Sequence, residues 1–151
     1  MIDRFEELLR ELGVEYGLTL HPDRRGACKL RINEVMSLQI EYNPDRIDLT
    51  VATFICEIPP GKFRENILKS ALQSNHLAPD KAILSYCDKN NQLALFQVIS
   101  MTTLTGKKLS ELLSDFIKKA EEWRVAVETG NLTSLTPAVR TGSKGMFGLT
   151  P

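Results

Sequence analysis

The segment 92–101 follows a polar turn and carries apolar side chains at seven of its ten positions. Successive side chains of a strand point to opposite faces of a sheet, so both faces of this strand are apolar. One face carries Leu93, Leu95, Ile99 and Met101, and the other carries Ala94, Phe96 and Val98. A strand of this kind is covered on both sides in the folded protein. A small domain with one layer of helices covers one face, so we expect a partner subunit to cover the rest.

Alternating apolar and polar residues predict further strands before this one. They lie at 28–32, 36–42, about 47–56 and 81–87. Asn33 suits a tight turn, which would join the first two strands as a hairpin. In the third strand, Ile47, Leu49 and Val51 share one face. The apolar Ala52, Phe54 and Cys56 fall on the other face, which indicates either a β-bulge or burial on both sides.

Apolar residues at helical spacing predict three helices. The first begins near Ile2 and stops at Gly13, the second covers about 61–75, and the third covers about 106–129 before Gly130. In the second helix one face carries Phe63, Ile67, Leu68, Ala71 and Leu72. The element order is helix, three strands, helix, two strands, helix. This order predicts an α+β fold with a twisted antiparallel sheet of about five strands.

The charge balance excludes some classes of partner. Lys and Arg number 19, as do Asp and Glu, so the formal net charge is zero. Binding to nucleic acid or to an anionic membrane is typical of more basic chains, and neither partner is predicted. A secretory signal has an apolar run after its start, whereas acidic residues occur here from Asp3 onward. No stretch approaches the ~20 apolar residues of a membrane span. A cytoplasmic protein is therefore expected.

The chain is expected to form one domain over residues 1–130, followed by a flexible tail. Residues 131–151 contain many Gly, Pro, Ser and Thr and have no apolar periodicity. Within this tail, the apolar patch at 146–149 would either dock on a partner or be part of an unstructured terminus.

Motifs for catalysis, for a metal site or for a cofactor are not found. Cys28, Cys56 and Cys87 lie far apart and are interpreted as reduced, mostly buried thiols. His21 and His76 lie in polar connectors. We therefore expect no enzymatic activity, no catalytic residue, no metal and no cofactor. A small enzyme acting through Cys87 and the two histidines is one alternative.

Several motifs occur in an order that resembles a known family. They are LGVEYGLTL at 12–20, RGACKLRIN at 25–33, LQIEY at 38–42, ILKSALQSN at 67–75 and FIKKAEEWR at 116–124. Together they resemble the class I chaperones of bacterial type III secretion, the Tir chaperone or CesT-like family. The resemblance covers about residues 1–128.

This resemblance implies a cytoplasmic, ATP-independent homodimer in a bacterium. Such a protein binds the N-terminal segment of one or more secreted effectors, keeps it partly unfolded and brings it to the secretion apparatus, where the secretion ATPase is a possible further partner. An extended segment can add to a sheet edge while its apolar residues fill grooves. The alternative is a regulatory or scaffold protein of the same fold with a different partner.

The resemblance also assigns residues to two surfaces. Effector binding is expected at Phe5, Leu8, Leu9, Leu12, Leu30, Ile32, Leu38 and Ile40. The dimer interface is expected at Ile67, Leu68, Ala71, Leu72, Ala82 and Leu84. Trp123 is expected to pack inside the domain rather than contact an effector.

Overall fold

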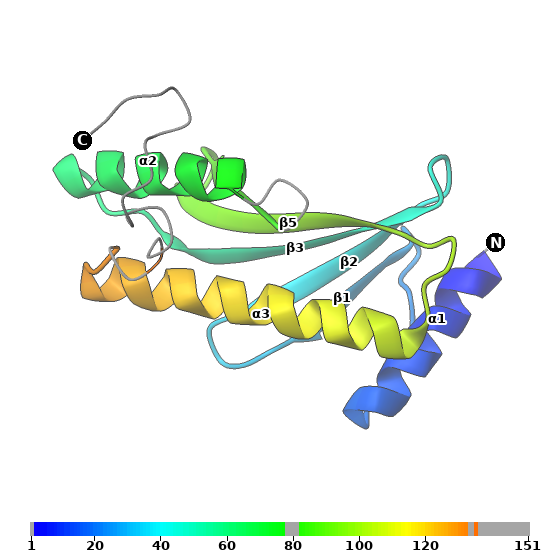
Figure 1. The fold of residues 1–151 in the computed structure, drawn as a ribbon. Coiled ribbons are helices and arrows are strands. Elements are labelled where there is room, and N and C mark those ends of the chain that lie inside the picture. The colour runs from blue at the N-terminus through cyan, green and yellow to red at the C-terminus, as the bar shows by residue number, and fades with distance from the viewer. Residues whose placement is uncertain (1, 78–81, 133–134, 136–151) are drawn as a thin grey trace.

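The computed structural model describes residues 2–77, 82–132 and 135 (Figure 1). Its elements are α1 (Ile2–Tyr16), β1 (Ala27–Arg31), β2 (Ser37–Asn43), β3 (Asp48–Glu57), α2 (Lys62–Leu77), β4 (Ile83–Cys87), β5 (Gln92–Ser100) and α3 (Gly106–Thr129). The five strands form one antiparallel sheet in the order β1-β2-β3-β5-β4. The predicted element order and fold class are confirmed.

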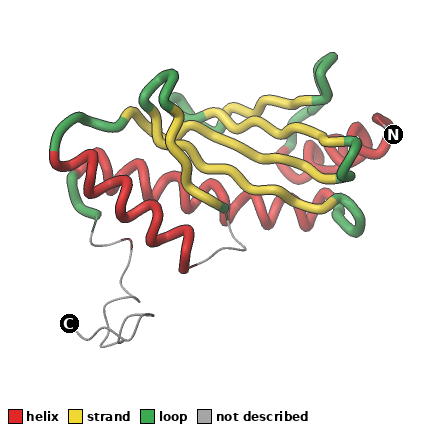
Figure 2. The backbone as a smooth tube through the Cα atoms, turned by 90° about the horizontal axis from the view of Figure 1, so that it is seen from above, coloured by secondary structure: helices red, strands yellow, loops and turns green. Residues whose placement is uncertain are grey.

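All three helices lie on one side of the sheet, and no other described element covers the opposite side, which is called bare in that sense (Figure 2). The core lies between these layers. Its strand side chains include Leu38, Ile40, Leu49, Val51, Leu93 and Leu95. From the helices come Phe5, Leu8, Leu9, Leu12, Ile67, Leu109, Leu113, Phe116 and Trp123. The burial of Trp123 agrees with its expected packing role.

The first helix runs past its predicted end. Gly13 is inside α1, and the helix ends before Gly17, which has a φ of 68°. The amide of Leu18 donates to the carbonyl of Gly13 at 2.8 Å, so the chain folds back over the last turn. A Cβ at position 13 would lie 2.4 Å from the Leu18 carbonyl oxygen. Gly13 therefore permits close approach of the backbone, whereas Gly17 supplies the left-handed turn that ends the helix.

The third strand departs from its prediction at both ends. Ile47 precedes β3, lies in the β2–β3 turn with a φ of 52° and is 56% exposed, so it does not share a strand face with Leu49. At the other end the register shifts between Phe54 and Cys56, which confirms the bulge among the two expected alternatives. The bulge brings Cys56 opposite Leu93 and leaves Phe54 on the bare face.

The third helix matches its prediction at both ends. The hydroxyl of Thr105 accepts a hydrogen bond from the Lys108 amide at 3.1 Å, and this N-cap starts the helix. Gly130 has a φ of 74° and ends it. Leu132 and Leu135 then pack against the core beyond the expected domain boundary at 130. Most of the expected tail, including its apolar patch, lies outside the described residues.

Candidate protein-binding surfaces

Most of the side chains expected to bind an effector are inside the domain. Phe5, Leu8, Leu9, Leu12, Leu30, Leu38 and Ile40 are buried, and Ile32 is partly buried. The Phe5 ring also stacks on Tyr42 with ring centroids 5.5 Å apart. A bound partner reaches such side chains only if the core opens. Their role in binding stays a prediction, and in this structure they support the surface above them.

The bare side of the sheet, called the open face below, is formed by alternate residues of the five strands. These residues are Lys29, Arg31, Gln39, Glu41, Thr50, Ala52, Phe54, Ile83, Ser85, Ala94, Phe96 and Val98. Phe54 and Val98 are each 50% exposed. The middle of this face is therefore apolar and uncovered, while its β1–β2 side is polar. An exposed apolar area of this kind is typical of an interaction site.

A groove of about 430 Å³ crosses the β1–β2–β3 half of the open face. Ala52, Phe54 and Ala94 give it an apolar floor, and Lys29 and Glu41 lie at its polar side. The Gln39 side-chain amide donates to the Glu41 carboxylate at 2.5 Å, which fixes that polar side. The groove can take an apolar side chain beside a charged one.

The predicted dimer residues fall into two groups. Ile67, Ala71, Ala82 and Leu84 are buried in the core of this chain, and Leu68 is partly buried. Leu72 is 70% exposed on the outer side of α2. The list left out Phe96, Val98 and Ile83 of the open face. The sequence did indicate that Phe96 and Val98 need cover, because both lie on the second apolar face of the strand 92–101.

The β4 edge of the sheet is partly closed. Helix α2 packs against β4, and the Asn75 side chain forms two hydrogen bonds to the backbone of Leu84, each of 2.8 Å. The Lys119 ammonium donates to the Ala82 carbonyl at 2.7 Å, just before the strand begins. Burial of the Lys119 side chain lowers the pKa of its ammonium group. A segment adding a strand at this edge would have to displace Asn75.

The β1 edge is closed only at its beginning. The amide of Ala27 donates to the Asp23 carboxylate at 3.0 Å, and the Ala27 carbonyl accepts from the Asp23 amide at 2.7 Å. Hydrogen bonding alternates along an antiparallel strand, so the backbone groups of Lys29 and Arg31 also point away from β2. No hydrogen bond within the described residues reaches them from that side. They form a short free edge.

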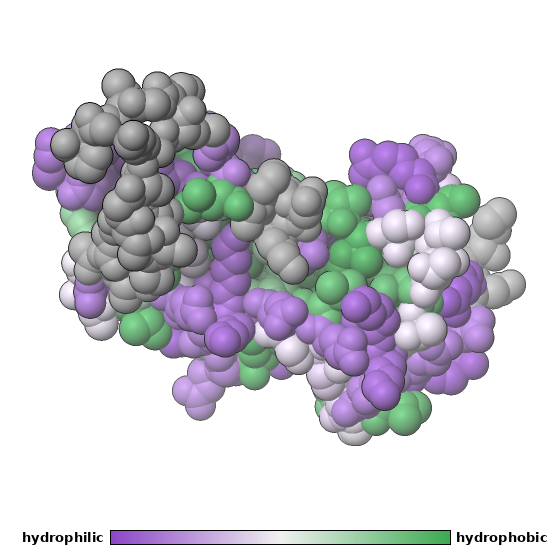
Figure 3. Space-filling view, viewed as in Figure 1, coloured by the Kyte–Doolittle hydropathy of each residue, from purple (hydrophilic) through white to green (hydrophobic). Residues whose placement is uncertain are grey.

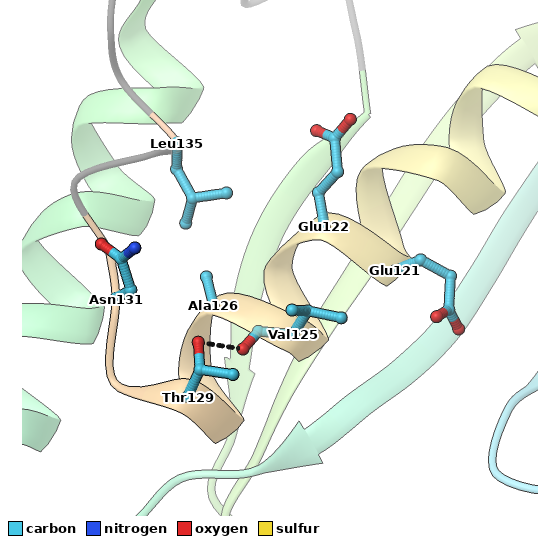
Figure 4. Close-up of a pocket in the computed structure, with 7 residues that line it drawn as sticks. All are labelled: Glu121, Glu122, Val125, Ala126, Thr129, Asn131 and Leu135. Carbon is cyan, nitrogen blue, oxygen red and sulfur yellow. Dashed lines mark hydrogen bonds between the residues drawn. The ribbon is translucent and has the colours of Figure 1, made fainter.

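The concavity in Figure 4 lies between the end of α3 and the segment after it. It has a volume of about 470 Å³. Val125, Ala126 and Leu135 give it apolar walls, and Glu121 and Glu122 give it acidic ones. The Thr129 hydroxyl donates to the Val125 carbonyl at 2.7 Å within the helix. This arrangement has no nucleophile next to a base.

Two further surfaces expose apolar side chains. Near the end of α1, Val14 and Leu18 line a concavity of about 310 Å³ together with Arg10 and His21. From the helix side, hydrophobic side chains appear above α3, over the strands, and hydrophilic ones border them (Figure 3).

Of the groups considered for catalysis, Cys87 is partly buried at the end of β4. His21 and His76 are exposed. Burial raises the pKa of the Cys56 thiol to about 11 and also raises that of Cys28, so both stay protonated at neutral pH. Within the described part of the chain, no cluster of three potential metal ligands occurs. In the same part, none of the helices has the length and hydrophobicity that crossing a bilayer demands.

Solved structures contain the same fold. A chain of the HopA1–SchA chaperone–effector complex aligns with a TM-score of 0.70 and 19% identity, over 83% of this chain and 96% of that one. A chain of the ExsC–ExsE complex gives a TM-score of 0.72 and 19% identity, with 84% and 96% covered. A chain of the ExoU–SpcU complex from the type III secretion system of Pseudomonas aeruginosa gives 0.60 and 20%, with 85% and 99% covered.

The sequence itself adds a family assignment. No curated protein matches the chain. Residues 7–124 match the sequence model of a protein family. This range covers all eight elements of the fold apart from the first residues of α1 and the last residues of α3. The chain belongs to the Tir chaperone protein (CesT) family.

Proposed function

We propose that this chain is a cytoplasmic type III secretion chaperone that binds the N-terminal segment of one or more secreted effectors. It holds that segment in an extended, partly unfolded state until the secretion apparatus, through its ATPase, takes it over. The function is binding without catalysis. Family membership and the fold shared with chains of chaperone–effector complexes support this proposal.

The observation that carries the proposal is a groove with an apolar floor on β3 and a polar side on β1 and β2, on the half of the sheet that ends in a free edge. The groove over Phe54 and the outward backbone groups of Lys29 and Arg31 lie on the same half of the sheet. An extended segment gains main-chain hydrogen bonds at such an edge and places alternate side chains on the two faces. Each apolar side chain that is fully buried contributes about 1.5–3 kcal/mol, which offsets the ordering of the segment.

We assign the other half of the open face to a second copy of the chain. Phe96 and Val98 of β5 and Leu72 of α2 are large apolar side chains that the described part of this chain leaves partly or largely exposed. A homodimer through α2 and the β4–β5 half of the open face would cover them. It would also supply the second cover that the two-sided apolarity of β5 requires.

The test is recovery of bound proteins by the tagged full chain from a lysate of its own bacterium, with identification by mass spectrometry. Secreted proteins, held through about their first hundred residues, are the expected result. The variant Phe54→Asp should recover less of them, whereas Val35→Asp, at an exposed site in the β1–β2 turn, should recover the normal amount. Recovery of only regulators or apparatus components would favour the scaffold alternative and overturn the proposal.

A further inference from the structure

The free edge of the sheet is basic, although the chain as a whole is neutral. Residues 24–31 contain four of the 19 basic residues, Arg24, Arg25, Lys29 and Arg31, and no acid. All four are exposed. Asp23 precedes them as the one nearby acid; the backbone amides of Ala27 and Arg25 and the charges of Arg25 and Lys29 lower the pKa of its carboxyl, so it offsets one of the four positive charges. The strand that would receive a partner therefore carries a local positive charge.

The positive groups on β1 itself point to one face of the sheet. Cys28 and Leu30 are buried on the helix side, so Lys29 and Arg31 lie on the open face. Arg31 donates to the carbonyls of Asn33 and Glu34, both at 3.3 Å, which fixes the guanidinium without neutralising it. Within the described residues, neither basic side chain forms an ion pair.

The nearby acids on β2 and α3 form no ion pair with Lys29 or Arg31 within the described residues, although Glu41 keeps its charge on the same face. The Glu41 carboxylate accepts a hydrogen bond from Gln39 at 2.5 Å. On the helix side, the Glu121 carboxylate binds Arg124 at 2.6 Å and accepts from Asn33 at 3.3 Å. Lys29 and Arg31 are both exposed and, within the described residues, unpaired with an acid, so a carboxylate from outside this part of the chain can reach them.

We propose that the segment added at β1 is acidic at alternate positions, with carboxylates opposite Lys29 and Arg31. This inference rests on the proposed function. Side chains directly opposite each other on neighbouring strands share a face. Residues i and i+2 of the segment therefore meet the two basic side chains, and residue i+1 points to the helix side beside Leu30 and the partly buried Ile32. The recognised pattern is acidic, apolar, acidic.

This pattern selects a partner by its charge, because an uncharged apolar strand would place no carboxylate opposite Lys29 or Arg31. Opposite charges across two strands stabilise the pair, and like charges destabilise it. We expect replacement of both acids by Lys in the segment to weaken its binding about tenfold or more. Since the pairs are exposed, this difference should shrink as salt is added.

The test is selection from a display library of random 12-residue peptides on the immobilised full chain. The same selection is run on Lys29→Glu/Arg31→Glu and on the matched control Lys107→Glu/Lys108→Glu, which reverses an exposed basic pair at the start of α3. The expected result is enrichment of the acidic, apolar, acidic pattern by the unmodified chain and by the control. The β1 variant should instead enrich the pattern with Lys or Arg.

The other outcomes overturn the inference in distinguishable ways. Enrichment of apolar peptides without the acidic alternation, by all three proteins alike, would refute the charge rule and leave peptide binding intact. Enrichment of no peptide by any of them would refute the proposed function as well. Salt-sensitive binding of a 20-nucleotide single-stranded DNA, lost in the β1 variant, together with no acidic enrichment, would assign the basic edge to nucleic acid.

Discussion

The side chain of Asn75 pairs with the backbone of Leu84 in both directions. Its amide nitrogen donates to the Leu84 carbonyl, and its carbonyl oxygen accepts from the Leu84 amide, each at 2.8 Å. One residue of α2 thereby supplies both hydrogen bonds that a neighbouring strand would give to this position of β4. The two edges of the sheet are therefore unequal, and among the described residues the free one is β1.

Replacing Asn75 should loosen the α2–β4 contact. Asn75→Ala leaves the partly buried amide and carbonyl of Leu84 without their partner, and an unmade hydrogen bond of this kind costs about 1–3 kcal/mol. We expect that loss in the free energy of unfolding measured by urea denaturation. Gln73→Ala, at an exposed site on the same helix, should change stability little. Equal stability of the two variants would show that the pairing contributes nothing.

Ile47 should be replaceable with a gain in stability. It is a β-branched residue held at a φ of 52° in an exposed turn, and the left-handed conformation costs about 1–2 kcal/mol for such residues. Asn tolerates that conformation, so Ile47→Asn should raise the free energy of unfolding by up to about 1 kcal/mol. The control Ile47→Val keeps the branching and should leave stability unchanged. A clear destabilisation by Asn would contradict this account of the turn.

The open face should control assembly rather than folding. Val98 is half exposed in the single chain, so Val98→Lys removes little burial from it. If a second copy covers this side chain, the substitution places charge in the interface and should convert a dimer to a monomer. Light scattering after size-exclusion chromatography measures this, with Val35→Lys as the control at an exposed site outside the face. A monomeric unmodified chain, or dimers of both variants, would refute the assignment.

The Cys56 thiol should react slowly with iodoacetamide at neutral pH. Its pKa of about 11 lies above that of an ordinary thiol, so the folded protein holds little thiolate until the pH is strongly alkaline. The labelling rate, followed by mass spectrometry of the Cys56 peptide, should rise between about pH 9 and pH 11. Urea-unfolded protein should label at the rate of a free thiol. Equal rates in folded and unfolded protein at pH 8 would contradict the burial.

The sequence predicted the elements well, because period and end signals are local. The third helix was predicted over about 106–129 and forms over Gly106–Thr129, because the apolar period is long and Gly130 gives a clear stop. The first helix was predicted too short because two glycines follow each other closely. Only the fold shows that Gly13 is required by the approach of Leu18, while Gly17 makes the turn.

The binding surfaces were harder to predict, because the core and an interface use the same residue types. Leu38 and Ile40 of β2 lie under the helices, whereas Phe54 of β3 lies on the open face. Their hydrophobicity does not distinguish them. The distinction depends on which side of the sheet the helices cover and on the bulge between Phe54 and Cys56. Neither can be read from periodicity alone.

Hydrogen exchange of the full chain, with and without the N-terminal segment of a secreted protein that it captures, tests the account most directly. Addition of an extended segment at β1 predicts slower exchange of the Lys29 and Arg31 amides in the complex. The amide of Leu84, already bonded to Asn75, should change little in comparison. Protection confined to other elements, with unchanged exchange in β1, would contradict binding of the segment at this edge.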